Sequence, residues 1–485
     1  MVRKVKRRRF IESVGVAGAV GLAGCSQGSD SPTETGNQSN GAQGDDTVML
    51  EWAASQEEAS EQEAFNDALH EAGLSEDIRV EFLSGGDVTE DRREQYQRWL
   101  SSGRSTPDLL RVDNGWTIPF IARDQLLNLS DHMSEDFSQR IEEEYFDPAV
   151  ATATGQDGGV YALPLWVGLP TMLYRKDLVE EAGHDPDGEN WATEPLTWQA
   201  FSTVVEDVKA NSDVDQGFVF QGDAYAGLAC CTFNEFMTTW GGAYFGGVDN
   251  LFGPVGDRPV TVADQKVEDS IRMVRTFVHG NDDPESLDGY AGNIAPEAVT
   301  NWTEQETNGA FQDGNAAFMR NWPYFVGVNG ADDEFGEDLG VMPLPQAVSE
   351  SESEYSGTGG SAAALGGWHV AVNPNTEYRE EALAVVEAAM SDEFNYAIFE
   401  LLGQIPPKSS LLDTDRARDI ETVGRYVDAY QVAGRNAIPR PVTVVWPDQS
   451  QLVYQEVNAA YSQQKAPDEA LADLESGLEE IETSV

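Results

Sequence analysis

Basic residues, cysteines and long apolar runs are all scarce in this sequence. Its 485 residues include 30 lysines and arginines against 85 aspartates and glutamates, and the formal net charge is −55 at pH 7. A surface of this sign repels nucleic acid and anionic lipid, which argues against binding through basic patches. Beyond residue 25 no stretch approaches the roughly 20 apolar residues that a membrane-spanning helix needs. We therefore expect the body of the chain to lie outside the bilayer.

The excess of acid does not indicate a disordered chain. Hydrophobic residues make up 40% of the sequence, and 46 glycines and 11 tryptophans are spread along it. This length and composition can bury a large core in two or three domains. Many carboxylates with few lysines suit concentrated salt, where charge repulsion is screened over a few ångströms. We therefore expect a halophilic source.

The first 46 residues indicate an export signal followed by a tether. Arg7-Arg8-Arg9-Phe10-Ile11 fits the twin-arginine pattern, and Leu22-Ala23-Gly24-Cys25 has the form of a lipobox. Residues 1–24 are predicted to be a twin-arginine lipoprotein signal, Cys25 the lipidated residue, and residues 25–46 a flexible tether. The mature protein would be anchored at the extracellular face of the membrane. A fortuitous basic start on a cytoplasmic protein, the alternative, does not explain the correct order of both motifs.

The cysteines and histidines give little indication of a disulfide framework or a metal site. Only Cys230 and Cys231 follow Cys25. Because adjacent Cα atoms lie closer than a disulfide prefers, we expect two small buried residues, with a vicinal disulfide as the alternative. The five histidines show no H-E-x-x-H motif or other paired metal-ligand spacing. The sequence therefore predicts no metal site and no cofactor.

The start of the body alternates between strand and helix patterns. Residues 48–52, 78–82 and 108–113 have strand patterns, and the helical residues 57–72 and 91–101 separate them. This order predicts a parallel sheet with crossover helices. Ligands of such sheets bind at the carboxyl ends of strands, which favours Glu57, Glu58 and Asp113 as site residues. The alternative is that acids follow strands by chance in a chain this acidic.

The run from residue 310 to residue 324 combines groups that seldom share a core element. Arg320, Asn321, Trp322 and Tyr324 surround Pro323, which ends any helix or central strand there. An aromatic face beside hydrogen-bonding groups suits the flat ring of a sugar. The alternative is a tryptophan packed under a loop.

Several motifs in one order resemble the extracellular solute-binding proteins of ABC transporters, family 1. The general motifs are Tyr161-Ala-Leu-Pro164, the run Met172-Leu-Tyr-Arg-Lys-Asp-Leu178 and Leu196-Thr-Trp-Gln-Ala-Phe201. Gly217-Phe-Val-Phe-Gln-Gly222, Phe311 to Tyr324, Leu365-Gly-Gly-Trp-His369 and Pro439-Arg-Pro-Val-Thr-Val444 are similar to motifs of the trehalose/maltose-binding branch. The resemblance covers essentially the whole chain after the tether.

The resemblance implies an α/β fold of the two-lobed periplasmic-binding-protein type (type II), with the ligand cleft between the lobes. Residues 46–165 with 345–400 would form lobe one, and residues 166–344 with 401–485 would form lobe two. It also implies a monomeric, non-catalytic receptor that captures a di- or oligosaccharide and delivers it to the transmembrane subunits of an ABC permease.

The resemblance also implies a set of ligand contacts. They are Glu58 or its neighbour Glu57, Arg93 or Arg92, Asp113, Trp166, Tyr225, Trp322, Gly367, Trp368 and Arg440. One position departs from the branch, because Gly168 stands where an acidic residue is usual. Losing one hydrogen-bond acceptor can change which sugar fits.

Two other functions stay open at this point. One is a binding protein of the same fold for a different solute, such as a glycoside or glycerol phosphate. The other is an extracellular glycoside hydrolase, which needs two carboxylates that flank one bond. No short catalytic motif such as G-x-S-x-G supports a hydrolase.

The charge predicts that stability depends strongly on salt. We expect the melting temperature to rise with KCl up to and beyond about 1 M, where the screening length falls to about 3 Å. Differential scanning calorimetry across a KCl series measures this, with sucrose at matched osmolality as the control. An unchanged melting temperature down to millimolar salt would contradict the halophilic interpretation.

Overall fold

A five-stranded mixed sheet organises the first part of the body. The computed structural model describes residues 47–85 and 89–484, so the predicted export signal, Cys25 and the tether lie outside the described residues. In the order β2-β1-β3-β10-β4, the strands are Ile78–Ser84, Val48–Ala54, Leu109–Asp113, Gly366–Val372 and Leu163–Gly168. β1 pairs in parallel with β2 and β3, as the sequence predicts, whereas β10 runs antiparallel to β3 and β4.

The helix predicted for residues 57–72 is two helices. α1 ends at Ser60 and α2 begins at Gln62, with Glu61 between them outside the helical conformation, and Ser55 starts α1 with a capping box. Glu58 Oε2 accepts from the Ser55 N–H at 2.7 Å, and Ser55 Oγ accepts from the Glu58 N–H at 3.3 Å. This box fixes Glu58 just beyond the end of β1.

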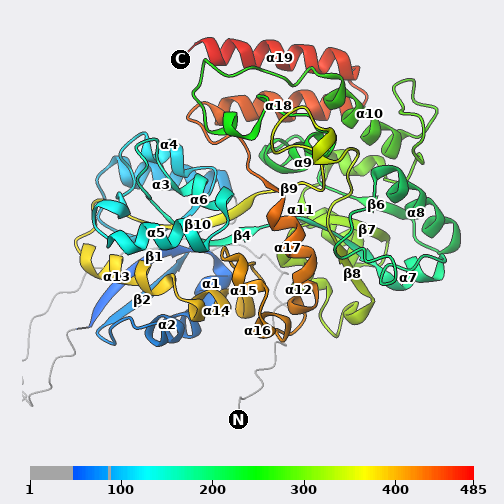
Figure 1. Cartoon of the computed structure of the whole chain (residues 1–485). Coiled ribbons are helices and arrows are strands. Elements are labelled where there is room, and N and C mark those ends of the chain that lie inside the picture. The colour runs from blue at the N-terminus through cyan, green and yellow to red at the C-terminus, as the bar shows by residue number, and fades with distance from the viewer. Residues whose placement is uncertain (1–46, 86–88, 485) are drawn as a thin grey trace, which may run out of the picture. The chain divides into compact units, whose positions relative to one another are not determined.

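Helices cover this sheet (Figure 1), and aromatic side chains pack in its core. Trp52 stacks on Phe82 with ring centroids 5.1 Å apart, and Phe65 lies 5.7 Å from Phe394 of α14. The helices are α1 Gln56–Ser60, α2 Gln62–Glu71, α3 Thr89–Ser101, α4 Thr117–Ile121, α5 Glu135–Glu144, α6 Asp147–Ala153, α13 Arg379–Ala389 and α14 Asp392–Leu402.

A four-stranded sheet organises the second part. In the order β6-β7-β5-β8, the strands are Gln216–Val219, Ala316–Asn321, Thr171–Arg175 and Leu339–Met342. β7 ends at Asn321, Trp322 is the N-cap of the next helix, and Pro323 is its first residue. Proline fits there because the first helical N–H has no intrahelical partner. The predicted chain break is thus a strand-to-helix turn.

Helices also pack around the second sheet, over a core of aromatic side chains that includes Trp198, Phe201 and Phe218. They are α7 Lys176–Glu181, α8 Trp198–Asn211, α9 Phe233–Thr239, α10 Gln265–His279, α11 Glu304–Gln312, α12 Pro323–Asn329, α17 Val427–Arg435, α18 Trp446–Tyr461 and α19 Pro467–Thr483. Short 3-10 turns span Leu129–Asp131, Val248–Phe252, Glu297–Asn301, Gly336–Asp338, Glu350–Glu352 and Val423–Tyr426.

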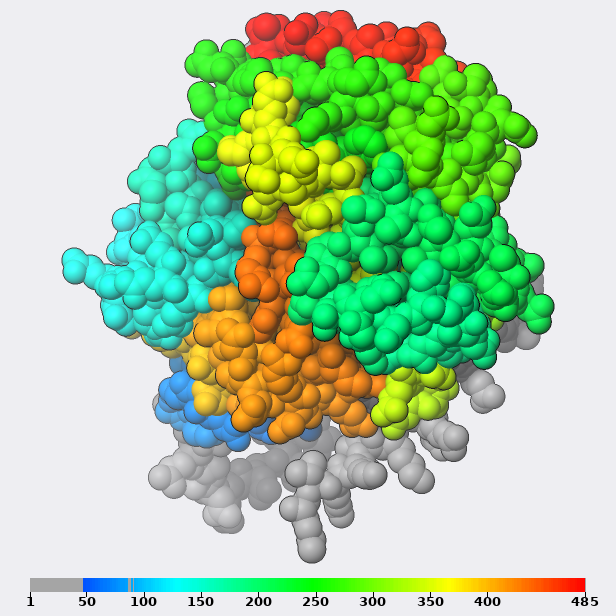
Figure 2. All heavy atoms as spheres, turned by 45° about the vertical axis from the view of Figure 1, so that its right-hand side comes forward, coloured from blue at the N-terminus to red at the C-terminus, as the bar shows by residue number. Residues whose placement is uncertain are grey.

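Three segments carry the chain between the two sheets. β4 leads into β5, and β9 (Ala363–Ala364), which pairs with β11 (Ala437–Ile438), leads into β10. The third follows α14, where Ile405 bridges to Val167 of β4, and α15 (Ser409–Leu412) and α16 (Asp415–Arg418) come next. Figure 2 shows this orange part of the chain at the surface, between cyan residues of the first part and green residues of the second.

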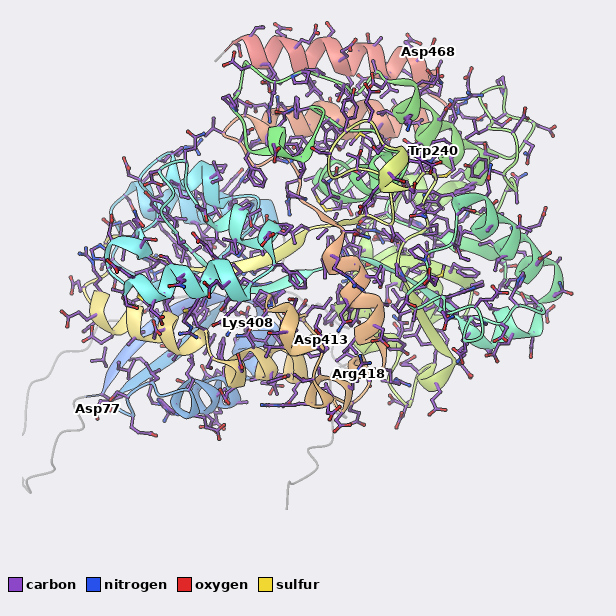
Figure 3. All side chains as sticks on the ribbon, in the orientation of Figure 1. Asp77, Trp240, Lys408, Asp413, Arg418 and Asp468 are labelled. Carbon is purple, nitrogen blue, oxygen red and sulfur yellow. A yellow bond between two sulfur atoms is a disulfide. The ribbon has the colours of Figure 1, made fainter. Side chains whose placement is uncertain are left out.

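Buried Lys408 fixes the third segment to the first part of the body. Its Nζ donates to Asp392 Oδ1 at 3.0 Å and lies 2.8 Å from Glu144 Oε2. Figure 3 labels Lys408 beside α15. Because one ammonium contacts two carboxylates from α5 and α14, the chain after Pro407 is held in place.

The lobe boundaries implied by the resemblance stay a prediction. Residues 345–400 were assigned to lobe one, yet the Gln346 N–H donates to Leu196 O at 3.0 Å and the Gly359 N–H to Thr238 O at 2.8 Å. Both acceptors belong to the part assigned to lobe two. Within the described residues, no helix is long and apolar enough to cross a membrane.

Cys230 and Cys231 form a vicinal disulfide. They lie in a π-helical turn, Leu228–Thr232, that leads directly into α9, and both are buried. The expectation of two unpaired cysteines is therefore wrong, although their burial was anticipated. The expectation relied on the larger Cα separation that most disulfides have, but the bond forms here with the Cα atoms 3.7 Å apart.

Mass spectrometry of the unreduced protein tests the disulfide. We expect the peptide that contains both cysteines to be lighter by two hydrogen atoms, and to resist alkylation in denaturant until a reductant is added. The reduced and alkylated peptide is the matched control. Alkylation of both thiols in denaturant without reductant would contradict the pairing.

Candidate functional site

An ion pair between two tryptophans joins the segment after β1 to the middle of β3. Arg111 Nη1 is 3.0 Å from Glu58 Oε2. The Arg111 guanidinium also stands 4.0 Å from the ring centroid of Trp368 and 4.9 Å from that of Trp166. Burial lowers the pKa of Arg111, and the Glu58 carboxylate opposes this. The cluster therefore combines a paired charge with two indole surfaces.

Arg92 joins this cluster through the Trp368 ring. Its Nη1 donates to Ala54 O at 2.9 Å, and its guanidinium lies 5.5 Å from the Trp368 centroid. Of the predicted pair, the structure thus places Arg92 beside the indole, whereas Arg93 is only partly buried. Of the two glutamates, Glu58 is buried and Glu57 is exposed.

Arg440 connects the segment after β11 to the end of β3. Its Nη1 lies 3.3 Å from Asp113 Oδ1, and its Nη2 donates to Asn114 Oδ1 at 2.9 Å. Asn114 Nδ2 in turn donates to Leu365 O at 3.0 Å, close to the start of β10. Two of the predicted ligand contacts, Asp113 and Arg440, therefore contact each other.

Trp322 shares one carboxylate with Tyr225. The Tyr225 hydroxyl donates to Glu304 Oε1 at 2.7 Å, and Trp322 Nε1 donates to the same oxygen at 3.5 Å. Burial, together with the Glu304 charge, raises the pKa of Tyr225 well above its ordinary value, so the phenol keeps its proton. Trp322 is half-buried.

Arg320 supports this turn from inside the protein. Its guanidinium makes two bonds to Glu235, at 2.7 and 2.6 Å, and one to Gln221 Oε1 at 2.8 Å. Glu235 Oε1 also accepts from the Ala364 N–H at 2.9 Å. The Trp322 ring centroid lies 4.9 Å from the guanidinium. Each guanidinium nitrogen of Arg320 therefore has a partner inside the protein, and these contacts stabilise the turn.

Gly367 is required by its backbone. Its φ is +133°, and a Cβ atom there would lie 2.4 Å from Trp166 O. Trp368, the next residue, pairs with Asp113 on one side and Trp166 on the other. Gly367 thus allows the backbone conformation that precedes Trp368.

Most predicted site residues lie in these connected clusters. Arg111 and Glu304 were missed by the sequence reasoning. Arg111 could have been found, since it shares a strand face with Asp113 two residues away. Glu304 carried no local signal, because it reaches the site only through the packing of α11. Among residues 47–85 and 89–484, no group of three potential ligands could hold a metal ion.

Two α/β sheets joined by several crossing segments, with charged and aromatic side chains where they meet, define the class of periplasmic-type binding proteins. The fold is similar to that of maltose-bound MalE3 of T. maritima, at a TM-score of 0.71 and 23% identity over 89% of this chain and 99% of that chain. It also resembles the cyclic α-maltosyl-1,6-maltose binding protein of Arthrobacter globiformis, at a TM-score of 0.68 and 18% identity over 90% and 100% of the two chains. The predicted α/β periplasmic-binding-protein fold is confirmed.

Residues 63–424 match the model of the family described as bacterial extracellular solute-binding protein, and the chain belongs to this family. A probable ABC transporter-binding protein of Deinococcus radiodurans is 27% identical over 80% of this chain and 82% of its own length. The family consists of solute-binding proteins, so membership confirms that the chain is no enzyme.

The Arg320–Glu235 pair predicts a large loss of stability when it is broken. Glu235→Gln leaves a buried guanidinium without its countercharge, which costs about 3–5 kcal/mol in the free energy of unfolding. Urea denaturation at constant high salt measures the loss. Glu71→Gln, on the exposed side of α2, is the matched control, and we expect it to change stability by less than about 0.5 kcal/mol. A loss below about 1 kcal/mol for Glu235→Gln would contradict the bracing role of Arg320.

Proposed function

We propose that this chain is the sugar-binding lipoprotein of an ABC importer, which captures a trehalose- or maltose-like di- or oligosaccharide. The observation that carries the proposal is the gathering of Trp166, Trp322 and Trp368 with paired arginines and carboxylates. Indole faces cover the C–H surface of a pyranose, and charged planar groups hydrogen-bond to its hydroxyls. Four or five such bonds, at about 1.5–3 kcal/mol each, are enough for micromolar affinity after the costs of association.

The pairing of the charges favours a neutral ligand. Arg111 is paired with Glu58, and Arg440 with Asp113. An anionic solute such as glycerol phosphate would bring its own charge next to these carboxylates, which is unfavourable. A polyol can accept from the guanidinium and donate to the carboxylate at the same time.

The site residues are assigned roles within this proposal. Trp322 stacks on one sugar ring, and Trp166 and Trp368 form an aromatic wall behind Arg111 and Arg92. Glu58, Asp113, Glu304 and Arg440 bind hydroxyl groups, and Tyr225 holds Glu304 in place. Ligand-driven closure of two lobes about the crossing segments would then complete the contacts.

The proposed location and partner rest on the sequence and on the family. The twin-arginine motif and lipobox support export and lipid anchoring through Cys25. The Deinococcus radiodurans relative, described as a probable ABC transporter-binding protein, supports delivery to a permease. The likeness to proteins whose structures hold maltose or an acarbose supports a sugar ligand.

Replacing Trp322 tests the assignment directly. We expect Trp322→Ala to bind sugar about thirtyfold more weakly, a loss of about 2 kcal/mol, because a central aromatic contact is removed. Isothermal titration calorimetry in high salt with maltose, trehalose and longer maltodextrins measures it. Tyr378→Ala, at an exposed aromatic residue just before α13, should bind like the wild type. Unchanged affinity of Trp322→Ala would overturn its role, and no binding of any carbohydrate by the wild type would overturn the proposed function.

A further inference from the structure

The vicinal disulfide packs against Trp322 of the candidate site. Cys230, Cys231 and Ala364 form one buried apolar cluster, and the Trp322 side chain lies against it. Cys230 is 8% exposed and Cys231 is 2% exposed. Because protein interiors are close-packed, neighbouring side chains must move when the two sulfur atoms change their separation. The position of the Trp322 indole therefore depends on whether these sulfur atoms are bonded.

One buried amide connects the disulfide to the segment of Arg440. Asn234 Nδ2 donates to Cys230 O at 3.3 Å and to Pro439 O at 3.4 Å. Pro439 directly precedes Arg440, whose guanidinium contacts Asp113 at the end of β3. Buried polar groups keep their hydrogen-bond partners, so a shift of the Cys230 backbone would draw Asn234 and the Pro439 segment with it.

The turn that holds the disulfide also lies between two other residues that support the site. Before the cysteines, the Leu228 N–H donates to Tyr225 O at 3.0 Å, and the Tyr225 hydroxyl donates to Glu304. After them, α9 carries Glu235, which accepts from Arg320. A change in this turn therefore reaches the contacts on both sides of Trp322.

Reduction changes both the size and the hydrogen bonding of the turn. Two sulfur atoms that are no longer bonded separate to a non-bonded distance, about 3.5–4 Å or more. Cys230 Sγ lies 3.7 Å from Gly227 O, to which a thiol can donate. In a cluster that is already packed, the extra volume displaces neighbouring groups. Trp322 is the half-buried neighbour of the cluster, so its side chain has the most room to move.

We propose that the Cys230–Cys231 bond is a thiol–disulfide switch that sets the affinity of the site for its ligand. This inference rests on the proposed sugar-binding function. With the bond formed, Trp322 and the segment of Arg440 are held in place; with two thiols, the turn relaxes and the ligand is bound more weakly. Twin-arginine export carries folded proteins, so a chain with the predicted signal would fold with two thiols in the reducing cytoplasm and form the bond outside. The switch would thus complete the site after export.

The redox step needs only a dithiol or a disulfide as its partner. A thiolate of the dithiol attacks the more exposed sulfur, Cys230 Sγ, the bond between the cysteines breaks, and Cys231 leaves as a thiolate that takes up a proton. The second thiol of the reductant then releases Cys230 from the mixed disulfide, and the reductant leaves as a cyclic disulfide. In the reverse direction, two electrons and two protons pass from the cysteines to a small-molecule disulfide outside the cell, which becomes two thiols.

Titration of the oxidised and reduced forms tests the switch. The folded protein is reduced in high salt with excess dithiothreitol under argon, and alkylation of a sample followed by mass spectrometry counts the free thiols. We expect reduction to weaken binding of maltose or trehalose about tenfold, a loss of about 1.4 kcal/mol, measured by calorimetry. The affinity should return when oxidised glutathione replaces the reductant.

The matched control is the double variant Cys230→Ala with Cys231→Ala, whose affinity should not respond to dithiothreitol. Wild type carried through the same steps with oxidised glutathione is a second control. An unchanged affinity of the reduced protein would overturn the inference. So would a disulfide that stays intact in the folded protein under excess reductant, or an equal response of the variant without these cysteines.

Hydrogen exchange tests the coupling without a ligand. On reduction we expect faster exchange in peptides that cover residues 320–325 and 436–442, and no change in α19, which lies outside the cluster. Faster exchange confined to residues 228–232 would overturn the inference. If the oxidised wild type binds no carbohydrate, the proposed function is overturned instead, and the exchange experiment still decides whether the disulfide controls the site residues.

Discussion

The buried contact between Arg320 and Glu235 is the constraint on which the candidate site depends. Removing two charges from water is costly, and the cost is offset only when every hydrogen-bonding group of the pair is satisfied. Here Glu235 accepts from both the guanidinium and the Ala364 N–H, and Gln221 Oε1 accepts from Arg320 Nη1. The Glu235 carboxylate of α9 thus bonds both to Arg320 of β7, in the second sheet, and to Ala364 of β9, which leads into β10 of the first sheet. Trp322 follows Arg320 by two residues, and its ring lies against the same guanidinium.

The sequence predicted the first three strands and the alternation with helices, because local periodicity and short connections determine them. It also anticipated that residues 320–324 form a turn of special composition, since proline restricts the backbone by itself. Three features of the fold were not predicted from the sequence. They are the break between α1 and α2 at Glu61, the Cys230–Cys231 bond, which depends on the geometry of one turn, and the antiparallel entry of β10, which depends on contacts some 250 residues apart along the chain.

The candidate site was partly predictable for a similar reason. Asp113 and Glu58 follow strands, so their positions are a local consequence of the sheet. Local sequence did not determine which of two adjacent residues takes part in the site. Arg92 and Arg93 are adjacent in the sequence, and only the packing of α3 decides which guanidinium contacts Trp368. Glu304 is one acid among 85 Asp and Glu residues, and it is distinguished only by the tyrosine and tryptophan that tertiary structure brings to it.

An acidic chain places a further demand on its ligand site. If the protein works in concentrated salt, as its charge predicts, the screening length is only a few ångströms and long-range attraction contributes little to capture. Interactions at contact distance are screened much less, and the burial of apolar surface is not weakened by screening. A site made of indole faces and of arginines already paired with carboxylates relies on these short-range terms. The same arrangement gives solvent ions few unpaired charges to bind, so a neutral solute would meet less competition from the salt around it.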